Sequence, residues 1–260
     1  MLQTAKILNV HITNERKKNI LEYVLKRIKN PEEKTFIVTP NPEMLVYANK
    51  HLDYQDKLNK ADIALPDGVG VLLAGAVLGR PLQERITGVD FVEKLCQAGA
   101  KLPLSIGFLG GKEGVAERAA ECLLRKYPYL NIVFVAEEWG EKGFMINDLR
   151  FKNDNKGKRI INHKSYILNQ SIDILFVAFG VPKQEEWIYK NLPKIPVKAA
   201  MGVGGAFDYF SGNVQRAPFI IRFLGFEWLY RLIAQPWRWK RQLALIEFVQ
   251  LVFKEKFASK

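Results

Sequence analysis

The sequence has no run of apolar residues long enough to cross a membrane. The longest run, Val69–Gly79, is far shorter than the ~20 residues that a membrane-spanning helix needs. The N-terminal segment, MLQTAKILNVHI, also lacks the long apolar core of a signal peptide. We therefore expect a cytoplasmic protein whose contact with a membrane is peripheral.

Cysteine and histidine are scarce. The chain has two cysteines, Cys96 and Cys122, and three histidines. Both cysteines fall in helix-like segments, and small buried thiols in a reducing cytoplasm are the simplest interpretation. No tight spacing joins cysteine to histidine, so the sequence predicts no zinc site.

Negative charge is also in short supply. The 39 Lys and Arg outnumber the 27 Asp and Glu, which gives a formal net charge of +12. An excess of this size indicates a polyanionic partner, which is a nucleic acid, an anionic membrane surface or a phosphorylated substrate. Residues 216–260 carry nine Lys and Arg against three Glu, or +6, and so supply half of the net charge.

What is present is a regular alternation of strand-like and helix-like segments. Strands are expected at Lys6–Ile12, Thr35–Thr39, Ala61–Leu65, Pro103–Leu109, Asn131–Ala136, Asp173–Phe179 and Val197–Met201. Helices are expected at Glu15–Lys29 (with Asn14 as N-cap), Glu43–Lys50, Val69–Leu78, Gly88–Leu95, from Gly114 through Lys126, and Pro182–Asn191. Nearly continuous apolar strands between helices predict an α/β fold, a Rossmann-like and mostly parallel sheet with helices on both faces.

The composition changes at about Arg216. We therefore expect a Rossmann-like core over residues 1–212 and a C-terminal appendage over residues 213–260, made of two or three amphipathic helices broken near Pro236. Three of the five tryptophans lie in this appendage: Trp228, Trp237 and Trp239. Four aromatic residues recur there at spacings of three and four, which predicts that they share one helix face: Phe219, Phe223, Phe226 and Tyr230.

Aromatic and basic residues together favour helices that lie in the plane of an anionic membrane. Arg231, Arg238 and Arg241 would share roughly one face of such a helix. An amphipathic helix docked on the core, with a solvated basic face, is the alternative. Earlier in the chain, the polar stretch Leu149–Lys164 is expected to be an inserted loop or a frayed helix.

The candidate site is organised around Asp67, in ADIALPDGVG. A buried strand ends at a proline, and an aspartate and a glycine follow at once. In an open α/β sheet, ligands bind at the carboxyl ends of the strands, where Asp67 would stand. A carboxylate there can act as a general base on a substrate hydroxyl. A simple turn or an N-cap is the alternative.

Other polar residues follow neighbouring strands in the same way. Thr39 and Asn41 follow the second predicted strand, and Gln184 follows the strand Asp173–Phe179, where they could donate hydrogen bonds to a sugar. Arg85 lies in the loop Arg80–Thr87 and could bind a phosphate with two hydrogen bonds.

Two glycine clusters follow strands as well. Gly110 and Gly111 precede a helix, and glycines in that position let backbone N–H groups approach a diphosphate. Gly204 and Gly205 follow the last strand, with Asp208 three residues on to bind a ribose hydroxyl or a base N–H. Structural turns, with Asp208 as a cap, are the alternative at both places.

Taken together, these motifs resemble the WecG/TagA/CpsF family of glycosyltransferases, and within it the TagA-type N-acetylmannosaminyltransferases of wall teichoic acid synthesis. The resemblance covers nearly the whole chain in the right order. The motifs that carry it are TPNPEML, ADIALPDGVGV, ERITGVDF, GFLGGKEGVAERAA, FVAFGVPKQEEWI, GVGGAFDYFSG and RAP…EWLYRL…QPWRWKR.

The resemblance implies an inverting transfer of N-acetylmannosamine from UDP-ManNAc to the 4-hydroxyl of GlcNAc on an undecaprenyl-diphosphate lipid, giving a β-1,4 linkage. Asp67 would be the catalytic base, Thr39 and Gln184 would position the sugars, and Arg85 would hold phosphate charge. No Asp-x-Asp motif is present. We therefore expect no metal and no other cofactor, with leaving-group charge met by arginines and backbone N–H groups.

In such proteins the C-terminal segment is thought to target the membrane and close the active site. The resemblance thus implies a catalytic core that is peripheral on the inner face of the cell membrane. Its partners would be a UDP-sugar donor, a polyprenyl-diphosphate-linked GlcNAc acceptor and the anionic membrane, and Arg231, Arg238 and Arg241 would reach the diphosphate. Without a membrane, the exposed aromatics would be buried against a second copy of the chain.

Three alternatives stay open at this point. Another member of the same family would use a different donor, such as UDP-ManNAc uronic acid or UDP-glucose. A basic nucleotide- or nucleic-acid-binding module without catalysis would bind oligonucleotides in a salt-dependent way. It would not explain the polar residues on one sheet edge, so we expect no nucleic-acid partner. A dehydrogenase is disfavoured by the spacing of the glycines.

Overall fold

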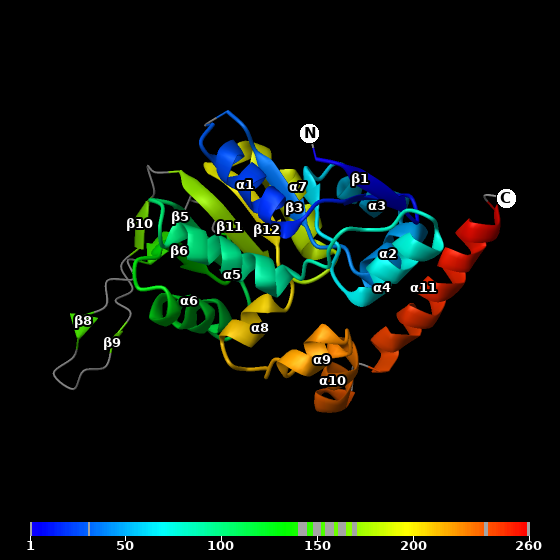
Figure 1. Ribbon diagram of the computed structural model, residues 1–260. Coiled ribbons are helices and arrows are strands. Elements are labelled where there is room, and N and C mark those ends of the chain that lie inside the picture. The colour runs from blue at the N-terminus through cyan, green and yellow to red at the C-terminus, as the bar shows by residue number, and fades with distance from the viewer. Residues whose placement is uncertain are drawn as a thin grey trace. The chain divides into compact units, whose positions relative to one another are not determined.

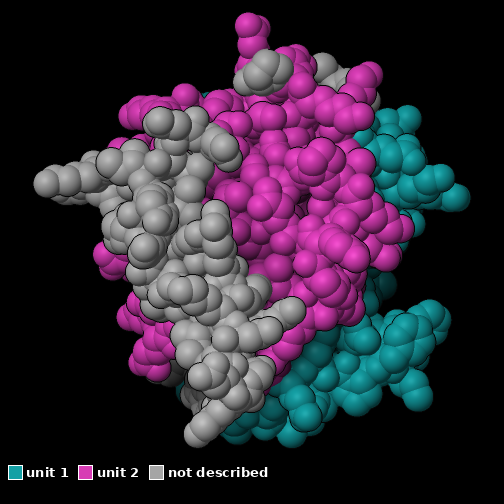
Figure 2. Space-filling model, turned by 90° about the vertical axis from the view of Figure 1, so that its left-hand side faces the viewer, with its two compact units in different colours: residues 1–23, 37–88, 215–260 teal, residues 24–36, 89–214 magenta. Residues whose placement is uncertain are grey.

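The computed structural model describes residues 2–30, 32–139, 145–147, 152–153, 159–160, 165–167, 171–236 and 239–258. The chain divides into two compact units, coloured separately in Figure 2. Unit 1 comprises Met1–Tyr23, Ile37–Gly88 and Gln215–Lys260, and unit 2 comprises Val24–Phe36 and Val89–Val214. The C-terminal segment therefore belongs to the same unit as Asp67.

A six-stranded sheet confirms the predicted α/β fold class. Its strands are hydrogen-bonded in the order β4-β3-β12-β11-β5-β6 (Figure 1). The pairs β3–β4, β11–β12, β11–β5 and β5–β6 are parallel. The central strands are buried along nearly their whole length, which requires cover on both faces. The strand bounds are β3 Thr35–Val38, β4 Ile63–Ala64, β5 Ser105–Gly110, β6 Asn131–Ala136, β11 Ile172–Ala178 and β12 Val197–Gly202.

The predicted helices of the core are present close to their expected bounds, and the structure adds the helices α3 and α8 and the 3₁₀-helix η1. Local signals explain their ends: α6, for example, carries an acidic residue in its first turn and two basic residues in its last turn, as the helix dipole favours. The helix bounds are α1 Lys17–Ile28, α2 Pro42–Lys50, α3 Leu52–Asn59, α4 Val69–Val77, α5 Gly88–Gly99, α6 Val115–Lys126, α7 Lys183–Asn191, the 3₁₀-helix η1 Leu192–Lys194, and α8 Ala206–Phe210.

The predicted insertion Leu149–Lys164 lies largely outside the described residues. Within and beside it the structure describes two short antiparallel pairs, β7 with β10 and β8 with β9. The bounds are β7 Met145–Asn147, β8 Lys152–Asn153, β9 Arg159–Ile160 and β10 Ser165–Ile167.

The prediction of one N-terminal strand at Lys6–Ile12 was wrong. The segment forms an antiparallel hairpin of β1 (Thr4–Ile7) and β2 (Val10–Thr13). Leu8 and Asn9 turn the chain with φ of +47° and +63°. Asparagine tolerates this left-handed conformation, but leucine does so rarely, and the turn was therefore not evident from the sequence. A carboxylate of the C-terminal helix stabilises it, because Leu8 N–H donates to Glu255 Oε2 at 2.9 Å.

Asn14 is not the N-cap of α1, as predicted from the sequence. Its side chain binds the loop before Arg85 instead: Oδ1 accepts from Gln83 N–H at 2.9 Å and Nδ2 donates to Pro81 O at 3.2 Å. The first backbone N–H of α1, on Lys17, donates to Glu84 Oε2 at 2.8 Å. A long-range carboxylate thus does the capping that the sequence assigned to a local side chain.

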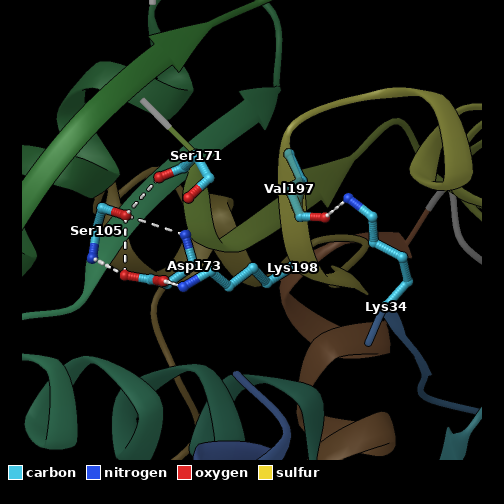
Figure 3. A network of polar contacts seen from close by, with 6 residues as sticks. All are labelled: Lys34, Ser105, Ser171, Asp173, Val197 and Lys198. Carbon is cyan, nitrogen blue, oxygen red and sulfur yellow. Dashed lines mark hydrogen bonds and ion pairs between the residues drawn. The ribbon is translucent and has the colours of Figure 1, made fainter. Parts of the chain in front are cut away.

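A polar network in unit 2 ties three parallel strands together at their amino ends (Figure 3). Asp173 Oδ2 accepts hydrogen bonds from Ser105 N–H at 2.8 Å and Ser105 Oγ at 3.0 Å. The other carboxylate oxygen of Asp173 pairs with Lys198 Nζ at 2.8 Å. Nearby, Lys34 Nζ donates to Val197 O at 2.7 Å, and burial lowers the pKa of Lys34. This network lies at the edge of the sheet opposite to the carboxyl ends, so it contributes to the scaffold.

Three helices follow Arg216, as the composition predicted: α9 (Phe219–Phe223), α10 (Glu227–Ala234) and α11 (Trp239–Ala258). The prediction that the four aromatic residues share one helix face was wrong. Gly225, at φ +82°, interrupts the helix between α9 and α10. The last helix, α11, lies alongside α2 and α4 (Figure 1). Phe248 and Val252 are buried in that contact. Lys50 Nζ pairs with Glu247 across it at 2.7 Å.

The outer surfaces of these helices remain apolar. Large hydrophobic side chains are exposed on all three of them: Phe219, Ile220, Phe223, Trp228, Ile233, Leu243, Ile246, Val249, Phe253 and Phe257. Within the described part of the chain, no helix combines the length and the apolarity needed to span a bilayer.

Candidate active site

Asp67 lies directly after β4 in unit 1, in a turn that the backbone defines closely. Its N–H donates to Pro40 O at 3.0 Å. Gly68 follows at φ +96° and ψ 149°, a conformation that is open essentially to glycine alone. The Asp67 side chain is half-buried, and its Oδ2 accepts a hydrogen bond from Gly88 N–H at 3.2 Å. The carboxylate is therefore oriented but still accessible.

Thr39 converges on the same place from the end of β3. A Cβ atom added to Gly88 would lie 3.4 Å from Thr39 Cγ2, and 3.7 Å from both Thr39 Oγ1 and Asp67 Oδ2. The structure thus brings together Thr39 and Asp67, two residues that the sequence predicted from separate strands. A carboxylate beside a hydroxyl can accept a proton from a bound alcohol and orient it.

Asn41, which follows Thr39, caps a helix. Its Oδ1 accepts from Met44 N–H at 2.9 Å, and Pro42 occupies the first turn of α2. This is the ordinary role of an asparagine before a helix. Its predicted contact with a sugar stays a prediction.

Arg85 is held against the C-terminal segment. Its Nη2 donates to Arg222 O at 2.7 Å. Two residues on, Thr87 Oγ1 accepts from Arg216 Nη2 at 3.5 Å. Arg216 in turn pairs with Glu227, with Nε and Oε1 3.6 Å apart. The arginine that the sequence assigned to phosphate is therefore part of a contact between the 85–88 loop and the segment after Arg216.

The glycines of the first cluster, in unit 2, make a close turn. A Cβ on Gly110, at φ +100°, would lie 2.8 Å from the carbonyl carbon and oxygen of Ala178. Gly111 N–H donates to Ala178 O at 3.2 Å. Backbone conformation and close packing of β5 on β11 explain these glycines, and the N–H of Gly111 already has a protein acceptor.

Gln184 is buried beneath the second glycine cluster. Only 1% of its surface is exposed. Its Oε1 accepts from Gly204 N–H at 2.9 Å, and its Nε2 donates to Glu185 Oε1 at 2.7 Å. A Cβ on Gly202 would lie 3.0 Å from that nitrogen. Gln184 thus holds the 202–205 turn in place, and a direct contact with a sugar is not evident from this geometry.

The remaining predicted residues are placed as follows. Gly205 precedes the short helix α8, and Asp208 is half-buried within it. Arg231 lies in the last turn of α10. Arg238 lies outside the described residues, and the side chain of Arg241 does too. In the part of the chain that the structure describes, no three His, Cys, Asp or Glu side chains are grouped to hold a metal ion.

The model of the glycosyl transferase WecG/TagA/CpsF family matches residues 5–260. The chain belongs to this family. The match includes both the α/β core and the C-terminal helices, so the basic appendage is part of what this glycosyltransferase shares with its family.

Three curated relatives of this WecG/TagA/CpsF family member carry the same name, N-acetylglucosaminyldiphosphoundecaprenol N-acetyl-beta-D-mannosaminyltransferase. One from Bacillus subtilis (strain 168) is 31% identical over 98% of this chain and 93% of its own length. One from Bacillus spizizenii is 37% identical over 86% of this chain and 80% of its own. One from Staphylococcus aureus (strain MRSA252) is 36% identical over 79% and 73% respectively.

Sequence reasoning missed several residues of the site. Gly88 and Thr87 lie within the motif ERITGVDF, but only the fold shows that they reach Asp67 and Arg216. Glu185 is fully buried beside Gln184, although a glutamate in the first turn of a helix normally indicates an exposed position. Arg216 was counted only as a contributor to net charge. No local signal in the sequence distinguishes it from the other basic residues of the appendage.

Proposed function

We propose that this glycosyltransferase moves N-acetylmannosamine from UDP-ManNAc to the 4-hydroxyl of GlcNAc on an undecaprenyl-diphosphate lipid, and forms a β-1,4 linkage. The observation that carries this proposal is the match to relatives of that name, which in the Bacillus subtilis protein covers 98% of this chain and 93% of the relative. The reaction belongs to the assembly of the linkage unit of wall teichoic acid.

Asp67 is the general base in this proposal. Its carboxylate takes the proton of the acceptor 4-hydroxyl, and the oxygen forms a bond to C1 of ManNAc from the face opposite UDP. The bond between C1 and the diphosphate oxygen breaks, and UDP leaves with the electron pair. The anomeric carbon is inverted in this single displacement. The support is geometric: Asp67 is half-buried, oriented by Gly88 N–H and adjacent to Thr39.

The charge of the leaving diphosphate is met without a metal ion in this proposal. Arginines and backbone N–H groups would supply the stabilisation. The sequence has no Asp-x-Asp motif, and the arginines proposed to reach the diphosphate are Arg231, Arg238 and Arg241 of the appendage. Gly204, Gly205 and Asp208 remain the proposed contacts of the uridine diphosphate within unit 2, while Gln184 shapes their turn.

The C-terminal helices bind the inner face of the cell membrane in this proposal, where the lipid acceptor resides. Exposed aromatic and aliphatic side chains on α9, α10 and α11 would enter the interface, and the basic residues among them would bind anionic headgroups. The alternative is that a second copy of the chain covers the same apolar side chains. Measuring whether the mass of the protein particle changes when vesicles are added would distinguish these two possibilities.

The test is a transfer assay on the purified chain with UDP-ManNAc, a short-chain GlcNAc-diphospholipid and EDTA. The expected result is release of UDP with formation of a ManNAc-GlcNAc lipid. Turnover that stops in EDTA and returns with Mg²⁺ would contradict metal independence. Turnover with UDP-ManNAc uronic acid or UDP-glucose, but not with UDP-ManNAc, would move the chain to another activity of the same family.

A further inference from the structure

The loop from Arg85 to Gly88 connects the catalytic carboxylate to the C-terminal segment. On one side, its backbone binds the segment that carries Asp67: Ile86 N–H donates to Pro66 O at 3.0 Å, and Gly88 N–H donates to Asp67 Oδ2 at 3.2 Å. Ile86 is fully buried, so the loop is fixed by packing as well as by hydrogen bonds.

On the other side, alternate residues of the same loop bind the C-terminal segment. Arg85 Nη2 donates to Arg222 O at 2.7 Å, and Arg216 Nη2 donates to Thr87 Oγ1 at 3.5 Å. The ion pair of Arg216 with Glu227 holds the guanidinium in position, with most of both side chains covered. Arg85 and Thr87 thus bind the C-terminal segment, whereas Ile86 and Gly88 bind Pro66 and Asp67.

A second contact of the C-terminal segment lies two residues after Asp67 in the chain. Gly225, between α9 and α10, packs on Val69, the second residue after Asp67. A Cβ on Gly225 would lie 3.0–3.2 Å from three side-chain carbons of Val69. Gly225 is buried and adopts φ +82°, so no other residue fits there without displacing one of the two segments.

We propose that Arg216 and Gly225 are positioning residues for the general base: they hold the 85–88 loop and the start of α4 on either side of Asp67. Docking of the C-terminal segment therefore sets the geometry of the carboxylate, in addition to any contact of that segment with lipid or diphosphate. The proposal deepens the proposed function and rests on the assignment of Asp67 as base.

The kinetic test compares Arg216→Ala and Gly225→Ala with Arg125→Ala. Arg125 is exposed on α6, outside both the 85–88 loop and the C-terminal segment, so its replacement removes the same charge without touching the loop. A short-chain acceptor in detergent removes the need for a membrane. We expect kcat to fall at least ~10-fold in the first two variants, because small displacements of reacting groups are costly. We expect the donor KM to stay within about twofold, and Arg125→Ala to match the wild type.

A loss that appears mainly in the donor KM of Arg216→Ala would overturn the proposal, because the guanidinium would then bind the diphosphate directly. Unchanged kcat in both variants would overturn it as well. Gly225→Ala carries no change of charge, so it separates positioning from electrostatics.

Hydrogen exchange supplies a measurement that does not depend on activity. We expect the amides of Ile86 and Gly88 to exchange faster in Arg216→Ala and Gly225→Ala than in the wild type or Arg125→Ala. If the wild type transfers no sugar from the donor, the proposed function fails. The exchange rates of the two amides still decide whether the C-terminal segment holds the loop. Unchanged exchange at both amides would refute the coupling.

Discussion

At the scale of single residues, the structure gives several side chains a role that differs from the one predicted from the sequence. Asp67 and Thr39 meet as the sequence predicted, because both follow strands at the carboxyl edge of the sheet. Gln184 and Arg85 were predicted to contact substrate, yet both have specific protein partners. A sequence identifies a polar residue at a strand end, but it does not tell whether that residue faces a ligand or supports a neighbouring turn.

Gln184→Ala tests the supporting role. The variant removes the acceptor of Gly204 N–H and the donor to a buried carboxylate, so we expect the free energy of unfolding to fall by about 1–3 kcal/mol. Urea denaturation of this variant and of Gln215→Ala, a change at an exposed glutamine, makes the comparison. Equal stability of the two variants would favour a role of Gln184 in binding substrate.

Gly68→Ala tests the turn after Asp67. At φ +96° and ψ 149° an alanine is strained, and we expect a loss of about 1–3 kcal/mol in unfolding free energy. Gly79→Ala is the matched control: its φ of +75° also disfavours alanine, but a Cβ there meets no other atom within 4 Å. We expect the control to lose only about 1 kcal/mol and to keep full transfer activity. Comparable losses in both variants would show that the Asp67 turn has no special strain.

At the scale of elements, strongly periodic helices and apolar strands were predicted well, whereas turns were not. The N-terminal hairpin and the break between α9 and α10 depend on left-handed residues at Asn9 and Gly225 within otherwise continuous patterns. The docking of α11 was left open by the sequence, since one helix carries both buried and exposed apolar residues. The docked-helix interpretation therefore applies to one side of α11, and the membrane-facing interpretation stays a prediction for its exposed apolar side.

Two phenylalanines of α11 mark its buried side and its exposed side. Phe248 is 4% exposed and Phe253 is 48% exposed. We expect Phe248→Ala to lower the free energy of unfolding by about 3–5 kcal/mol, since a buried aromatic side chain is lost. We expect Phe253→Ala to change stability by less than about 1 kcal/mol and to weaken sedimentation with anionic vesicles. Vesicle binding that survives Phe253→Ala together with Phe257→Ala would exclude this face from the membrane contact.

At the scale of the whole molecule, the sequence predicted the α/β class, the family and the residues at the sheet edge. It did not predict how the appendage reaches the site. The contacts of Arg85 with Arg222 and of Arg216 with Thr87 join residues 137 and 129 positions apart. No helical or strand period relates residues so distant, and the charges involved look like any others in a basic segment. The division into residues 1–212 and 213–260 stays a prediction, and the structure places the appendage in one unit with Asp67.

The most direct test of the central claim is single-turnover transfer by Asp67→Asn, measured beside the affinity of the same variant for UDP. The amide keeps the shape of the carboxylate but cannot accept the acceptor proton. We expect UDP to bind as in the wild type and the transfer rate to fall at least ~100-fold, as expected for loss of a general base. A transfer rate within about twofold of the wild type would remove Asp67 as the base.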